Sequence, residues 1–191
     1  VGGLDWKGRG PDVLMRQVTQ ALVAAGGELM LGVEATRLVM REGRCIGVEA
    51  QRDGRPLVLE CRQAVILADG GFQANLELVG RHIAPSPANL IQRGAATGNG
   101  AGLRMAVEAG AATTEMVSFY GHLLIRDAFR NDMLWPYPQL DELAVAGIMV
   151  DQDGRRFADE GLGGVYLANV VARRSDPLST TAIFDSDIWR S

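Results

Sequence analysis

A pair of glycines follows an apolar run in the first half of the chain. The run is Gln63–Ala68, and Asp69, Gly70 and Gly71 come directly after it. Glycine has no Cβ, so its backbone can lie against a bulky ligand that a side chain would push away. A continuous apolar run predicts a strand buried on both faces, and open α/β sheets bind ligands where their strands end. The pattern predicts a nucleotide site at this turn, with a plain strand-to-loop turn as the alternative.

Histidine and tyrosine side chains supply the candidates for contact with a substrate. His122 can donate a hydrogen bond to a carboxylate in its neutral or its protonated form. Its neighbours Phe119 and Tyr120 would also suit an ordinary packed loop. Tyr120, Tyr137 and Tyr166 are candidate proton donors or substrate ligands. The sequence contains no metal-binding His-Glu-x-x-His or nucleophilic Gly-x-Ser-x-Gly pattern that would offer a rival chemistry.

Composition narrows the class of protein. The 191 residues are 47% hydrophobic and 22% charged, which is ordinary for a globular protein. A net charge of -4 argues against a nucleic-acid partner, and no apolar run is long enough to predict a membrane span. Cys45 and Cys61 stand far apart, without a neighbouring histidine, so neither a metal nor redox chemistry is indicated. We expect two thiols in a reducing cytoplasm.

Helical and strand patterns alternate along the chain. Pro11 and Asp12 suit the first turn of a helix, and apolar residues recur at helical spacing as far as Gly26. Turn residues at 41–44 and 53–54 separate runs that predict a three-stranded antiparallel meander. Further strands are predicted at 28–31, 147–151, 155–158 and 181–185, and further helices at 103–109 and 165–173. The fold class is therefore an α/β portion followed by an α+β portion. The first portion offers too few parallel strands for a doubly wound sheet, so we expect the sequence to be an internal fragment.

These strings, in this order, resemble the fumarate reductase and succinate dehydrogenase flavoprotein family, which includes tricarballylate dehydrogenase and the 3-ketosteroid dehydrogenases. The resemblance covers nearly the whole chain and rests on short motifs, namely Gly8–Gly10, Ala24–Gly26, Ala68–Phe72 with Asn75, Arg93-Gly94, Gly100–Ala106, Ala109–Ala111, Gly147–Asp151 and Gly154–Glu160. It implies an FAD-dependent oxidoreductase that exchanges a hydride between the flavin and a small organic acid or ketone.

The resemblance also implies a division of the chain and a set of partners. Residues 1–71 would be part of a Rossmann-like FAD-binding domain, 72–111 a crossover returning to it, and 112–191 an incomplete cap domain for the substrate. The family's dinucleotide fingerprint would lie before Val1, and its second substrate histidine and arginine beyond Ser191. The partners implied are a small-molecule substrate, with a carboxylate as one candidate, and the remainder of the polypeptide or an electron donor or acceptor.

Carried over residue by residue, the resemblance implies FAD contacts at Glu34, Ala35, Ala68, Asp69, Gly70, Gly71 and Ala101. Two of these positions depart from the family pattern. Asp69 stands where a threonine is usual, and an acid beside a phosphate-bearing cofactor must face away from it or weaken its binding. Ala101 stands where the family usually has an aspartate that contacts the flavin, unless Asn99 takes over that role.

The proton donor departs from the family pattern as well. His122 lies where the family has a histidine that binds the substrate carboxylate, but the arginine expected four residues after Glu160 is replaced by Gly164. Arg173 or Arg174 could take its place only through a shift in alignment. The resemblance therefore does not imply fumarate reduction itself. A catalytically inactive or binding-only fragment is the alternative reading.

Overall fold

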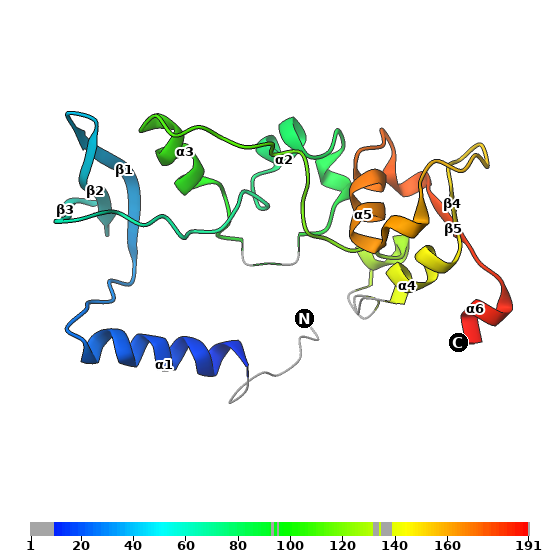
Figure 1. Cartoon of the computed structure of the whole chain (residues 1–191), viewed down its shortest axis with the longest axis horizontal. Coiled ribbons are helices and arrows are strands. Elements are labelled where there is room, and N and C mark those ends of the chain that lie inside the picture. The colour runs from blue at the N-terminus through cyan, green and yellow to red at the C-terminus, as the bar shows by residue number, and fades with distance from the viewer. Residues whose placement is uncertain (1–9, 93, 95, 132–133, 135–138, 191) are drawn as a thin grey trace. The chain divides into compact units, whose positions relative to one another are not determined.

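The structure, a computed structural model, describes residues 10–92, 94, 96–131, 134 and 139–190. The chain divides into two compact units, Val1–Leu67 and Ala68–Ser191, and each unit is described by itself. Figure 1 labels the helices and strands of both. Among the described residues, no helix combines the length and the apolar character that crossing a bilayer requires.

Helix α1 (Pro11–Ala24) opens the described part of the first unit. Proline occupies the first helical position and Asp12 the first turn, as the sequence predicts, and Gly26 follows the helix with a φ of 83°. The predicted helix is confirmed. None of its residues is buried, and Leu14, Met15, Val18, Leu22 and Val23 are all exposed.

The meander predicted from the turn residues is also confirmed. Strands β1 (Val33–Arg41), β2 (Arg44–Arg52) and β3 (Arg55–Glu60) form an antiparallel sheet in sequence order. Two-residue turns join them, and both positions of each turn have positive φ: 51° and 75° at Glu42-Gly43, 51° and 74° at Asp53-Gly54. Such turns match the twist of the flanking strands.

Two predicted strands of this half of the chain are wrong. Residues 27–30 have no regular structure, and β1 begins only at Val33, after a turn at Leu31-Gly32. The apolar run Gln63–Ala68 forms no strand either, and Ile66 is 87% exposed. A strand buried on both faces needs a neighbour along each edge, and the described residues provide no parallel partner for this run. The apolar residues of this run predict burial, but other described residues do not bury them.

The second unit is built from short elements. Its helices are α2 (Leu76–His82), α3 (Ala101–Glu108), α4 (Gln139–Ala146), α5 (Gly164–Ala172) and α6 (Ser186–Arg190). Short 3₁₀ turns cover Pro87–Asn89, Arg126–Phe129, Glu160–Leu162 and Pro177–Ser179. The predicted helices at 103–109 and 165–173 are confirmed as α3 and α5, whereas the sequence did not predict α2 and α4.

A two-stranded antiparallel sheet pairs β4 (Ile148–Val150) with β5 (Thr181–Ile183). Both strands agree with the sequence prediction. The predicted hairpin partner at 155–158 forms no regular strand, but it lies along β4 through an antiparallel bridge between Val150 and Arg156 and backbone hydrogen bonds from Asp151 to Arg155 and from Phe157 to Met149. Val150 is therefore paired both with Thr181 of β5 and with Arg156.

Two buried clusters pack the second unit. One contains Leu123, Ala144, Met149, Leu167 and Ala168, and the other contains Val79, Ile83, Ala84 and Ala172. Phe119 packs against both. The buried side chain of Asn169 on α5 accepts a hydrogen bond from the amide of Phe119 and donates one to its carbonyl, at 3.0 and 2.8 Å. The loop that carries Phe119 to His122 is thereby fixed to α5.

The fold is thus a mixture of helices and antiparallel sheet, which fits the predicted fold class of a partial FAD-binding domain. The assignment of residues 112–191 to a cap domain stays a prediction.

Candidate functional site

The glycine turn presents open backbone. Gly70 has a φ of 88°, a conformation that residues with a Cβ rarely adopt. No heavy atom lies within 4 Å of the place where its Cβ would stand, while at Gly71 that place is 3.0 Å from Oε1 of Gln73. Gly70 therefore offers the bare main chain that the sequence predicted at this turn, although the preceding segment is not a strand.

The acid at position 69 faces the start of helix α3. Asp69 Oδ2 accepts a hydrogen bond from the amide of Gly102 at 2.7 Å. The place of a Cβ on Gly102 would overlap the Asp69 carboxylate, so glycine at 102 makes this contact possible. The Asp69 carboxylate is thus engaged by the protein itself, and its effect on FAD binding stays a prediction.

Three further hydrogen bonds join the same two segments, 69–75 and 98–102. The amide of Gly100 donates to the carbonyl of Gly71 at 3.2 Å, and the amide of Ala74 donates to the carbonyl of Gly98 at 2.8 Å. The side chain of Asn75 donates to the carbonyl of Asn99 at 3.1 Å, and it also caps α2. The glycine turn is therefore held against the first turn of α3.

Ala101 begins helix α3 and lies close to this turn along the chain. Its amide donates to Oδ1 of Asn99 at 3.0 Å. The Asn99 side chain, which the sequence offered as a replacement for the missing aspartate, thus accepts the first amide of the helix in this structure.

His122 is held by a buried acid. Its Nδ1 lies 2.5 Å from Oδ2 of Asp141, and the amide of Leu123 donates to Oδ1 of the same carboxylate at 2.8 Å. The side chains of His122 and Asp141 are only 13% and 12% exposed. The contact holds the ring in place, and a carboxylate in its ionised form accepts the hydrogen of Nδ1 there. Asp141 did not stand out in the sequence, because the pattern of its segment did not predict α4.

Helix α5 begins directly against this acid. The place of a Cβ on Gly164 would lie 2.6 Å from both Cβ and Cγ of Asp141. Position 164 is where the resemblance would put the proton-donating arginine. A side chain of any kind there would collide with Asp141. An arginine at position 164 and the observed placement of Asp141 beside His122 therefore exclude each other in this structure.

A cavity of about 760 Å³ brings several predicted residues together. Gly71, Tyr120 and His122 all line it. Most of its other lining side chains are apolar, among them Phe72, Leu76, Val79, Ile83, Leu90, Ile91, Phe119, Leu124, Phe129 and Val171, and its polar side chains include Gln73, Asn89, Gln92 and Arg126. Arg126 was not singled out in the sequence, because a lone arginine in a loop carries no pattern. The cavity has the mixture of apolar walls and few polar groups that is typical of small-molecule sites.

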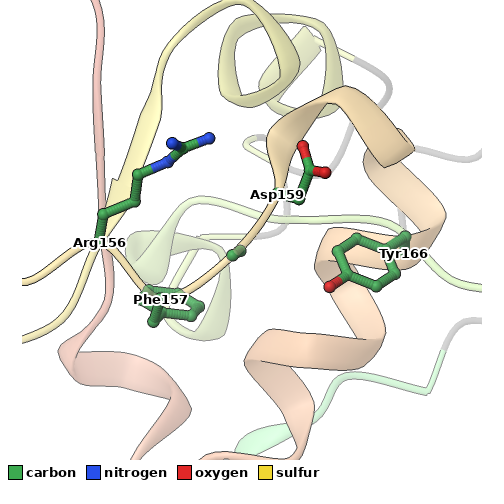
Figure 2. Close-up of a pocket in the computed structure, with 5 residues that line it drawn as sticks. Arg156, Phe157, Asp159 and Tyr166 are labelled. Atoms are coloured by element: carbon green, nitrogen blue, oxygen red, sulfur yellow. The ribbon is translucent and has the colours of Figure 1, made fainter.

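The three tyrosines have different surroundings. Tyr120 is 80% exposed, and its ring stands at 86° to that of His122 with 5.1 Å between the ring centres. Tyr166 lies on α5 and lines a separate, open pocket together with Arg156, Phe157 and Asp159, as Figure 2 shows. Tyr137 lies outside the described residues. Tyr120 is the tyrosine that the structure places next to His122.

Glu34 and Ala35 belong to the first unit. Both are exposed on β1, beside an irregularity in its pairing with β2 between Ala35 and Arg37. Exposed backbone at a bulge is compatible with the adenine contact that the resemblance implies. Their part in binding FAD stays a prediction, as do those of Ala68, Asp69, Gly70, Gly71 and Ala101.

The arginines near α5 have structural partners. Arg173 donates to the carbonyl of Val117, while Arg174 pairs with Asp151 at 3.1 Å and lies over the ring of Phe157. Neither contact is with His122 or Tyr120. The structure therefore gives no support to the alignment shift that would make one of them the proton donor.

Glu160 is a further buried acid of this unit. Its carboxylate accepts hydrogen bonds from the Arg156 guanidinium and, at 2.6 Å, from the amide of Met149. The Arg156 hydrogen bond, followed by that of the Met149 amide, lowers the pKa of Glu160 to about 2. Glu160 is therefore ionised at neutral pH and ties its own 3₁₀ turn to β4.

The sequence pattern of the protein family described as FAD binding domain matches residues 5–183. This match defines the class of protein, a flavoprotein domain whose cofactor is FAD. The chain belongs to the fumarate reductase and succinate dehydrogenase-like flavoprotein family, whose members are FAD-dependent oxidoreductases. The resemblance seen in the sequence and the FAD cofactor that it implies are confirmed.

Known proteins of this kind are similar over different shares of the chain. NADH:acrylate oxidoreductase of Vibrio harveyi is 30% identical over 67 residues, which are 35% of this chain and 7% of that protein. The 3-ketosteroid-Δ4-(5α)-dehydrogenase of Rhodococcus jostii RHA1, solved with 4-androstene-3,17-dione, is similar over 93% of this chain and 34% of its own, with 23% identity and a TM-score of 0.63.

Two more solved structures share the fold. The 3-ketosteroid Δ1-dehydrogenase of Sterolibacterium denitrificans is similar over 90% of this chain and 32% of its own, with 22% identity and a TM-score of 0.65. A flavocytochrome c3 fumarate reductase is similar over 93% of this chain and 30% of its own, with 21% identity and a TM-score of 0.59. This chain thus spans about a third of the length of these structures.

Proposed function

We propose that this chain is part of an FAD-dependent oxidoreductase that exchanges a hydride between the flavin and a small organic acid or ketone. The observation that carries the proposal is the cavity of the second unit, which is lined by Gly71 of the glycine turn and by Tyr120 and His122. FAD, when bound, supplies the two-electron chemistry, and the protein supplies binding and orientation. Open backbone at Gly70 fits a cofactor that must approach the main chain closely.

His122 is the proposed substrate-binding residue. Asp141 holds Nδ1 and so fixes the ring, in the way that a buried carboxylate orients the histidine of many active sites. With Nδ1 committed to Asp141, Nε2 can donate to a carboxylate or a carbonyl oxygen of the substrate in the protonated ring. The largely apolar walls of the cavity support a substrate with a substantial apolar body rather than a compact dicarboxylate.

We extend the proposal to the organisation of the protein. Residues 1–71 contribute to the FAD-binding domain, residues 72–111 return to it, and residues 112–191 form part of a substrate-binding cap. The remainder of the polypeptide, or a separate electron donor or acceptor, completes the redox reaction. The free thiols of Cys45 and Cys61 are compatible with a cytoplasmic protein.

Replacing His122 tests the proposal in the full-length enzyme. We expect His122→Ala to raise the KM for a carboxylate or ketone substrate at least tenfold, roughly 1.4 kcal/mol, because the hydrogen bond to the substrate is lost. Steady-state kinetics with a series of enones and unsaturated acids would measure the change.

The chain offers a matched control, because its other histidine is His82 on α2, in ring contact with Phe72. His82→Ala should leave KM within about twofold, below the tenfold step that 1.4 kcal/mol represents. An unchanged KM in His122→Ala would remove His122 from the site.

A second candidate is a catalytically inactive or binding-only protein. It is favoured by Asp69, Ala101 and Gly164, which stand where the resemblance implies a threonine, an aspartate and an arginine. The purified protein is first titrated with FAD, with binding followed by quenching of flavin fluorescence, and substrate is then added while the flavin absorbance is monitored. An active enzyme binds FAD and reduces or oxidises it with substrate, whereas a binding-only protein binds FAD and leaves its absorbance unchanged.

A further inference from the structure

We infer that Asp69 is a positioning residue for FAD, because its carboxylate fixes the glycine turn to the first turn of helix α3. The inference rests on the proposed placement of the cofactor at this turn. The negative charge of Asp69 would otherwise be unfavourable beside a phosphate-bearing ligand, and the inference explains why an acid stands at this position.

The contact of Asp69 substitutes for a missing helix cap. Helix α3 begins at Ala101, and its N-cap residue, Gly100, has no side chain that could accept a hydrogen bond. Asp69 reaches the helix from 33 residues earlier and accepts the Gly102 amide at 2.7 Å. A carboxylate at this end of a helix forms a charge-assisted hydrogen bond and is favoured by the helix dipole.

The contact of Asp69 with Gly102 fixes the residue before Gly70, and a backbone hydrogen bond fixes Gly71, the residue after it. The carbonyl of Gly71 accepts the amide of Gly100 at 3.2 Å, so both neighbours of Gly70 are bonded to the same short segment. Gly70 is thereby held with a φ of 88° and open space beside it. Without Asp69, one of the two anchors is lost, and the turn can move away from the conformation that a ligand would meet.

The negative charge of Asp69 is also offset by this arrangement. The helix N-terminus carries partial positive charge from amides without helical partners. Because the carboxylate is directed at one of these amides, less of its charge acts on a neighbouring phosphate. The structure therefore accounts for an acid at a position where the resemblance implies a neutral threonine.

FAD affinity of purified full-length variants, measured by quenching of flavin fluorescence, tests the inference. We expect Asp69→Ala to raise the dissociation constant at least tenfold. Asp69→Asn keeps an oxygen that can accept the Gly102 amide and should stay within about threefold, below the tenfold step of 1.4 kcal/mol. Asp185→Ala is the matched control, because Asp185 also accepts backbone amides at a helix start, those of Asp187 and Ile188.

A double-mutant cycle provides the second measurement and needs no cofactor. Gly102→Ala should lower the thermal midpoint of the apoprotein, because the new Cβ overlaps the Asp69 carboxylate. In the Asp69→Ala background the same substitution should be neutral or stabilising, since the overlapping atoms are gone and alanine suits a helix better than glycine.

The outcomes are distinct. The inference is overturned if Asp69→Ala binds FAD within threefold of the wild type, or if it weakens binding no more than Asp185→Ala does. It is also overturned if Gly102→Ala costs the same with and without Asp69. A wild-type protein that does not bind FAD would instead overturn the proposed function, while the cycle would still report on the contact itself.

Discussion

The two units of the chain differ in how their regular structure relates to burial. The first unit has a helix and a three-stranded sheet with good local geometry, yet among its described residues Ala50 is the only buried hydrophobic residue. The second unit has shorter helices and a two-stranded sheet, but it encloses two hydrophobic clusters and three buried polar or charged residues, Asp141, Glu160 and Asn169. The longest helix and strands and the packed clusters are therefore found in different parts of the described chain.

The difference shows that local signals and tertiary packing act separately. Helix α1 and the meander follow from a proline at a helix start and from two turns with glycine, signals that operate over a few residues. Their apolar side chains, such as Leu22, Val58 and Leu59, remain exposed in the described structure. The second unit depends on contacts between distant residues, such as Phe119 with Asn169, that no local signal specifies.

The largest expected effect comes from comparing the same substitution in the two units. Leu167 is 0% exposed, and Leu22 on α1 is 43% exposed. Leu167→Ala should lower the free energy of unfolding by about 3 kcal/mol, because it leaves a cavity in a packed cluster. Leu22→Ala should cost less than about 1 kcal/mol, because less of its surface is removed from water.

Urea denaturation followed by circular dichroism would measure both values. An equal loss in the two variants would break the comparison, since it would mean that α1 is as firmly packed in the native protein as α5.

A smaller effect is expected at Glu160, whose charge belongs to the packed unit. Glu160→Gln keeps most of the shape but weakens the hydrogen bonds from Arg156 and Met149, and should cost about 2 kcal/mol at neutral pH. The pKa of Glu160 is lowered from 4.5 to about 2. Its ionisation therefore stabilises the folded state fully above pH 4.5, and this stability is lost as the pH falls toward 2.

Thermal midpoints of wild type and variant between pH 7 and pH 2 provide the measurement. The difference between the thermal midpoints of wild type and variant should become smaller as the pH falls from 4.5 toward 2. A gap that stays constant would show that the charge of Glu160 does not act on stability, and only its shape would matter.

The smallest effect is expected for the ion pair between Arg37 and Glu49, which lies across β1 and β2 in the first unit. The Nη2 to Oε1 distance is 2.6 Å, but the side chains are 62% and 37% exposed. Water and salt screen such pairs, so Arg37→Ala should change the thermal midpoint by no more than about 2 °C. A large, salt-sensitive loss in calorimetry would indicate that the sheet relies on charge where it lacks a core.

The sequence predicted most elements whose signals are local. The helix at Pro11, the two hairpin turns and the helix that ends before Gly110 were predicted correctly, because proline and glycine restrict the backbone directly. The run Gln63–Ala68 was predicted wrongly, because apolar composition reports a tendency toward burial and not the presence of neighbouring strands. Helix α4 was missed, since its sequence adjoins residues rich in proline and aromatic side chains.

The candidate site was predicted in part for the same reason. Gly70, Gly71 and His122 stood out by residue type and by family resemblance. Asp141 did not, because its importance comes from Nδ1 of His122 and from the close approach of Gly164, and both depend on the fold. The engagement of Asp69 with Gly102 likewise joins positions 33 residues apart, which no spacing rule relates.

The two tight turns of the meander have a consequence for the order of folding. Every pairing in that sheet joins neighbouring strands, so its closing loops are short and cost little chain entropy. Hairpins of this kind form within about 1–10 μs, whereas contacts across fifty residues, such as that of Phe119 with Asn169, form more slowly. During synthesis, the meander is therefore expected to take shape while the segment that surrounds His122 is still being made.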